Sequence, residues 1–162
     1  MDLKADLSLA AASVIVDTAL VRARAAGLLP LTVVVLDAGG HPVAVKREDG
    51  SGILRFDIAS GKAWGALGMG MSSRMIRDRL KDRPTFQAAL AAASGGRFVP
   101  VPGGVLIRDA DGAVIGAVGI SGDASEKDEY CAIEGIRAAG LTPDPLEADP
   151  DWADASLGPS AH

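Results

Sequence analysis

Apolar residues in the segment 8–26 recur at the spacing of one helical face, which predicts an amphipathic helix. The stripe consists of Leu9, Ala12, Val16, Ala19, Leu20 and Ala23. Ser8 is a suitable N-cap, and Gly27 suits the left-handed position that follows a helix. The chain therefore begins with a helix that is expected to cover a sheet.

Five short apolar runs, each bounded by turn residues, predict β-strands. They are Leu31–Leu36, His41–Arg47, Phe98–Val101, Val105–Ile107 and Val114–Ile120. The turn sequences at 37–40 (Asp-Ala-Gly-Gly) and 109–112 (Asp-Ala-Asp-Gly) predict that the strands on either side form hairpins.

Four further helices are predicted from apolar spacing and capping residues. They cover 53–69, 74–80, 85–93 and 126–139. The first contains three glycines, each of which costs about 1 kcal/mol relative to alanine in a helix interior. We expect such a helix to pack closely against another backbone, either the sheet or a second subunit. Ser125 and Asp128 have the spacing of a capping box for the last helix.

The resulting order is α-β-β-α-α-α-β-β-β-α. Strands joined by hairpins favour an α+β fold, with a five-stranded antiparallel sheet and helices packed on its faces. We expect one domain over residues 1–142. The segment 143–162 is rich in Pro and Asp and is expected to be a loosely packed tail that docks on a neighbour through Trp152.

The composition of the chain argues against some classes of binding partner. The chain has 162 residues, a net charge of −5 and only 4% aromatic residues, which argues against nucleic acid as a partner. No apolar run approaches the roughly 20 residues that span a bilayer, and no export signal is seen at the start, so we expect no membrane association and a cytoplasmic location. Cys131 is the only cysteine and is expected to be a buried, unreactive thiol. With two histidines, His41 and His162, no metal site is expected.

Several basic residues and glycines are placed to bind a small anion. Arg47 ends a strand, Arg55 begins a helix, and Lys62 follows two turns later on the same side. Gly103 and Gly104 can present backbone N–H groups, and the helix that begins after the turn at 121–123 favours anions at its N-terminus. The alternative for the basic residues is a role as surface charges or interface ion pairs.

The same residues would suit a cofactor-free enzyme acting on a small unsaturated or oxo-carboxylate, as an isomerase or hydratase in a catabolic pathway. Lys62 would stabilise the developing enolate, and His41 and Asp123 are candidate acid/base groups. Asp37 and Glu126 are further candidates. The alternative for Asp37 and Asp123, which is the more typical one for Asp in such turns, is a turn-forming role.

The order of four sequence blocks indicates a family. VVVLDAGGHPVAVKREDG is followed later by PGGVLI, DADGAVIGAVGISG and DEYCAIEGIRAAGL. Over residues 8–142 this resembles the GlcG/HbpS-like haem-binding family, whose module also forms the C-terminal domain of PduO-type proteins. The resemblance implies a five-stranded α+β domain, a homo-oligomer, and haem as ligand, which a few relatives degrade. It also implies Thr85 as a candidate hydroxyl ligand.

Three hypotheses follow. The first is an oligomeric binding protein for a small ligand, with haem implied by the resemblance. The second is the cofactor-free enzyme on a small carboxylate. The third is a structural assembly domain, which would leave Lys62 and the double glycine at 103–104 without a pocket.

Overall fold

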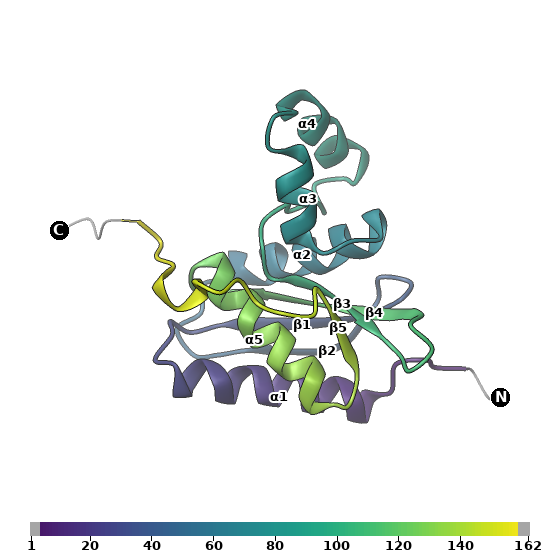
Figure 1. Ribbon diagram of the computed structural model, residues 1–162, viewed down its shortest axis with the longest axis vertical. Coiled ribbons are helices and arrows are strands. Elements are labelled where there is room, and N and C mark those ends of the chain that lie inside the picture. The colour runs from purple at the N-terminus through teal and green to yellow at the C-terminus, as the bar shows by residue number, and fades with distance from the viewer. Residues whose placement is uncertain (1–3, 159–162) are drawn as a thin grey trace.

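The computed structural model describes residues 4–158. It shows a five-stranded antiparallel sheet with helices on both faces (Figure 1). The strands are β1 Thr32–Asp37, β2 Pro42–Arg47, β3 Gly104–Arg108, β4 Val114–Ser121 and β5 Thr142–Asp144. Their order across the sheet is β2-β1-β4-β3-β5. The predicted α+β class is confirmed.

The fifth strand is not the predicted one. Phe98–Val101 is irregular and crosses over α2 (Leu54–Met69), where the Val99 N–H donates to the Gly61 carbonyl at 3.4 Å. The fifth strand is β5, which pairs with β3 and begins at the predicted boundary of the tail. The element order is therefore α-β-β-α-α-α-β-β-α-β. Apolar residues at 98–99 pack on a helix rather than in a sheet, and local propensity does not separate these two uses.

The two faces of the sheet bury different sets of strand side chains. Helices α1 (Leu9–Ala25) and α5 (Ser125–Ala138) lie side by side on one face, and α2 covers the other (Figure 1). Side chains alternate between the faces along each strand, as the two-residue period of a strand requires. Those facing α1 and α5 are Val33, Val35, Val105, Ile107, Val118 and Ile120. Those facing α2 are Val34, Leu36, Leu106 and Ala117.

The ends of α1 are confirmed, whereas the start of α5 differs from the prediction. Ser8 Oγ accepts the Ala11 N–H at 3.1 Å, and Gly27 has a φ of 67°. Helix α5 has Ala124 as its N-cap, without a side-chain cap hydrogen bond. The predicted capping box is wrong, because Asp128 turns into the interior of the protein.

Helix α2 approaches the sheet so closely that two strand glycines are required. A Cβ at Gly119 would lie 1.8 Å from the Ala59 carbonyl oxygen, and one at Gly104 would lie 2.3 Å from the Lys62 carbonyl oxygen. The expected close packing is confirmed, and the partner is the sheet. The helix glycines Gly61 and Gly65 instead make room for the crossing segment.

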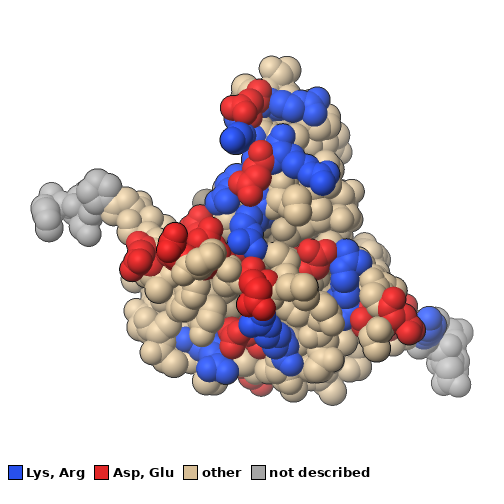
Figure 2. Space-filling view, viewed as in Figure 1, with Lys and Arg blue, Asp and Glu red and all other residues tan. Residues whose placement is uncertain are grey.

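Helices α3 (Ser73–Leu80) and α4 (Pro84–Ala93) project away from the sheet on the α2 side (Figure 1). Residues 73–97, the α3–α4 projection, contain six basic and two acidic residues, although the whole chain carries a net charge of −5. Blue side chains gather over this projection in Figure 2. Within residues 4–158, no helix combines the length and apolar character needed to cross a membrane.

The segment after β5 packs on α5. The Trp152 ring stacks on Tyr130 of the same chain, with ring centres 3.7 Å apart. Arg137 donates to the Leu146 carbonyl at 2.6 Å, and its guanidinium pairs with Glu147 at 2.7 Å. The predicted contact of Trp152 is thus made within the chain.

Candidate functional site

A buried ion pair joins the helices of the two faces. Lys62 Nζ on α2 lies 2.9 Å from Asp128 Oδ2 on α5, and the two side chains are 2% and 1% exposed. Burial raises the pKa of Asp128, and the Lys62 ammonium counters this effect by stabilising the carboxylate. A lysine is rarely buried, and the negative charge of Asp128 compensates the Lys62 ammonium in the interior.

Predicted site residues converge around this pair. A Cβ at Gly103 would lie 2.9 Å from Lys62 Nζ, so the glycine provides space for the ammonium. The other oxygen of Asp128 accepts the Asp123 N–H at 3.2 Å. Arg55 donates to Ser121 Oγ at 3.2 Å and also favours the charged form of the Asp128 carboxylate.

The polar groups of this cluster are largely satisfied by one another. The Gly104 N–H donates to Ser73 Oγ at 2.7 Å, so this backbone donor is already used. Asp123 accepts the backbone N–H of Leu29 at 2.9 Å and that of Ala124 at 2.7 Å. Lys62 lines none of the hollows described below. The cluster therefore holds α2 and α5 together around the end of β4.

The carboxylate next in sequence is buried without such partners. Glu129 is fully buried, and neither of its oxygens has a hydrogen-bond partner among the described residues. Arg74 Nε on α3 lies 3.3 Å from Glu129 Oε2. Burial raises the pKa of Glu129 to about 7, and the charges of Arg74 and Arg77 oppose this rise. Sequence reasoning missed this residue, because a glutamate in a helix is ordinarily exposed.

Three predicted site residues lie elsewhere. His41 is 80% exposed at the β1–β2 hairpin, next to Asp37 at 3.4 Å. The hairpin is at the opposite end of β1 from Ser121, about 17 Å along the strand. Arg47 is exposed at the end of β2, and Thr85 is exposed in the first turn of α4.

Asp37 and Glu126, the further acid/base candidates, have structural partners. Asp37 Oδ1 accepts the backbone N–H groups of Gly39 and His41 at 2.8 and 2.9 Å. The hydrogen bond from His41 lowers the pKa of Asp37, as expected for a turn-forming residue. Glu126 accepts from Arg77 at 3.1 Å.

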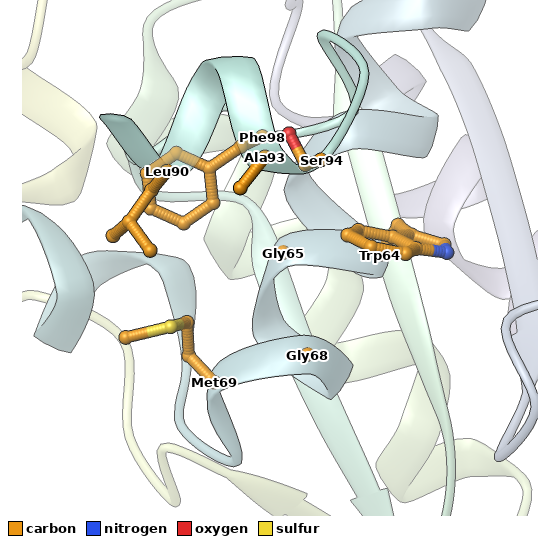
Figure 3. Close-up of a pocket in the computed structure, with 8 residues that line it drawn as sticks. All are labelled: Trp64, Gly65, Gly68, Met69, Leu90, Ala93, Ser94 and Phe98. Atoms are coloured by element: carbon orange, nitrogen blue, oxygen red, sulfur yellow. The ribbon is translucent and has the colours of Figure 1, made fainter. Parts of the chain in front are cut away.

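An apolar cleft of about 180 Å³ lies between α2 and the α3–α4 projection. Its lining residues are Trp64, Gly65, Gly68, Met69, Leu90, Ala93, Ser94 and Phe98. Figure 3 shows Leu90, Phe98 and the Met69 side chain on one side of the two glycines and the Trp64 ring on the other. Sequence reasoning missed this cleft, because Phe98 was assigned to a strand. The available signal was a single Trp within a glycine-rich helix.

A second hollow, of about 470 Å³, also borders Trp64. It lies between α2, the tip of the β1–β2 hairpin and the loop Gly95–Arg97. The Arg97 guanidinium lies over the Trp64 ring, 4.2 Å from its centre. This arrangement was not predicted either.

Comparison with known proteins identifies relatives over most of the chain. Residues 7–137 match the family model described as haem degrading protein HbpS-like, which confirms the resemblance seen in the sequence. No curated protein matches.

Three solved structures illustrate the similarity. PduOC, whose structure was solved in complex with heme, has 27% sequence identity to this chain and a TM-score of 0.75. The match covers 83% of this chain and 96% of the PduOC chain. A double mutant of Streptomyces reticuli HbpS is 25% identical, with coverages of 85% and 89% and a TM-score of 0.70. Klebsiella pneumoniae protein ORFY, at 24% identity, coverages of 86% and 94% and a TM-score of 0.75, shares the fold.

Proposed function

The chain belongs to the HbpS-like family, and from this premise we propose that it binds haem in the cleft between α2 and the α3–α4 projection. The observation that carries the proposal is the cleft itself, which has apolar walls and a floor of two glycines. A flat apolar ring can approach a glycine backbone more closely than it can approach any other residue. The relative PduOC was solved with heme bound, which supports the same ligand here.

The residues of the cleft fit one edge of a haem. Trp64, Leu90 and Phe98 offer apolar contact, and Met69 places a thioether, a known type of axial donor, in the lining. The basic α3–α4 projection would attract the propionates. Haem, when bound, supplies a redox-active iron.

Other candidate iron ligands are less well placed. Cys131 is buried, and burial raises its pKa to about 12, so the thiol stays neutral. His41 and Thr85 do not line the cleft, although Thr85 lies on the same helix as Leu90. His162 lies outside the described residues.

We also propose that the protein works as a homo-oligomer in the cytoplasm. A cleft of about 180 Å³ is smaller than the roughly 300 Å³ at which ligand pockets usually begin, so a second subunit would complete it. Apolar side chains on the same side of the sheet are available for self-association. They are Val45, Ile53, Leu54 and Phe56, which are 40–83% exposed.

Titration with hemin tests this proposal. We expect a saturable Soret shift at micromolar protein and a changed spectrum for Met69→Leu, because the thioether donor is lost. Met75→Leu is the matched control, since Met75 is exposed on α3. The absence of a saturable shift in the wild-type protein would refute haem binding.

Catalysis on a small carboxylate receives less support. It assigns the central role to Lys62, whose ammonium is buried against Asp128 and borders neither the cleft nor the second hollow. A Lys62→Ala variant that kept full turnover on a substrate would remove this role. A purely structural role leaves the apolar cleft unexplained.

A further inference from the structure

We propose that the second hollow, on the Arg97 side of Trp64, is a binding site for a carboxylate group carried on a flat apolar body. Arg97 is the main reason. Its guanidinium is held over the Trp64 ring at 4.2 Å, and its Nε donates to the Ser94 carbonyl at 3.0 Å. Within residues 4–158, no carboxylate pairs with this guanidinium, so its terminal N–H groups remain available to a ligand.

Other polar groups border the same hollow. Ser60 lines it, and Ser60 Oγ is buried without a hydrogen-bond partner among the described residues. A buried hydroxyl without a partner is uncommon and calls for an acceptor. The indole nitrogen edge of Trp64 faces the hairpin, where a Cβ at Gly40 would lie 3.0 Å from Nε1. Three residues with hydrogen-bond donors, Arg97, Ser60 and Trp64, thus line the same hollow.

The remaining walls define the body of the ligand. Leu36, Pro42 and Phe56 contribute apolar surface, which favours a flat ring or an unsaturated chain. Asp57 also lines the hollow and would repel an anion, so the carboxylate should bind at the Arg97 end. The carboxylate could belong to a free small acid or to a propionate of a haem whose ring occupies the neighbouring cleft. The first source is independent of haem binding, and the second depends on it.

Benzoate, a flat apolar body with one carboxylate, is the probe for a free acid. We expect it to shift the NMR signal of the Trp64 indole N–H, with the signal assigned by means of Trp152→Phe. Arg97→Gln should weaken benzoate binding about 10- to 100-fold, which is the usual effect of losing a charged hydrogen-bond partner. Arg79→Gln, at an exposed arginine of α3, should leave it unchanged. Asp57→Asn should tighten binding, because a like charge is removed.

Hemin and hemin dimethyl ester test whether the carboxylate is a haem propionate, because the ester has no free carboxylate. If benzoate does not bind, Arg97→Gln should weaken hemin about 10- to 100-fold and leave the ester unaffected. Benzoate binding without hemin binding would support the carboxylate site and refute the haem proposal. The carboxylate site is overturned if benzoate does not bind and Arg97→Gln affects hemin no more than its ester.

Discussion

Strand β4 presents side chains of different size to the two faces of the sheet. On the α1–α5 face, strand residues such as Val118 and Ile120 are large and completely buried. On the α2 face, the neighbouring positions of β4 are Ala117 and Gly119, and the helix touches the strand backbone. Both hollows lie on the α2 side, where they border Trp64.

The α1–α5 face therefore contributes mainly to stability, whereas the candidate binding sites lie on the α2 side. Large interlocking side chains fill the α1–α5 face, and filled cores resist change because each lost methylene group is costly. On the α2 face the helix contacts the backbone of the strands at glycines, and the outer side of this helix lines both hollows. The two faces are linked at α5, through Lys62–Asp128 to α2 and through Glu129–Arg74 to α3.

Breaking the link between the faces should have the largest effect. Lys62→Met leaves Asp128 buried without a counter-charge, and we expect a loss of about 3–5 kcal/mol in the free energy of unfolding, measured with urea. Lys46→Met is the control, because Lys46 pairs with Asp17 at the surface, and it should cost less than about 1 kcal/mol. Equal losses would show that Lys62–Asp128 does not connect the faces. The double variant Lys62→Met/Asp128→Asn should recover part of the loss.

Adding one methyl group to the α2 face should have the next largest effect. In Gly119→Ala, the new Cβ would collide with the Ala59 carbonyl oxygen, and lifting the helix should cost about 3 kcal/mol. Gly52→Ala is the matched control, since a Cβ there meets no atom within 4 Å. Thermal unfolding of the two variants checks this prediction. Equal stability would mean that α2 has room to move away from the sheet.

The contact between α5 and α3 should give a smaller effect that depends on pH. Glu129 keeps its proton up to about pH 7 in the folded protein, against 4.5 ordinarily. Folding is therefore favoured by this group at low pH, and that contribution is lost as the pH rises through about 7. Relative to Glu129→Gln, the wild-type protein should lose about 2 kcal/mol of unfolding free energy between pH 5 and 8. A difference between the two proteins that does not change with pH would contradict a pKa of about 7 for Glu129.

The local signals in the sequence predicted most elements correctly. Ser8 and Gly27 mark the ends of α1 in both the prediction and the structure. The Asp-Gly hairpin and the glycine-rich helix were also found, because caps, turns and helical periodicity depend on neighbouring residues. The strand at Phe98–Val101 failed because an apolar run looks the same whether it packs on a helix or joins a sheet. Strand β5 was missed because Thr-Pro-Asp has little strand propensity and is ordered by its pairing with β3.

The candidate site was only partly predictable. Lys62, Gly103 and Asp123 were all predicted as site residues, and the structure brings Gly103 and Asp123 close to the Lys62–Asp128 pair. Asp128 was assigned to a cap, because its spacing from Ser125 fits that motif equally well. Pairing between residues 66 positions apart leaves no periodic signal.

By itself, the sequence determined the α+β class, the family and the close packing of α2. These properties follow from patterns that are local or that recur along the chain. Only the tertiary structure decided that Lys62 pairs with Asp128, that Glu129 is buried without a hydrogen bond, and that Arg97 lies over Trp64. Burial and charge pairing are properties of the space between elements, and that space exists only after distant segments have packed together.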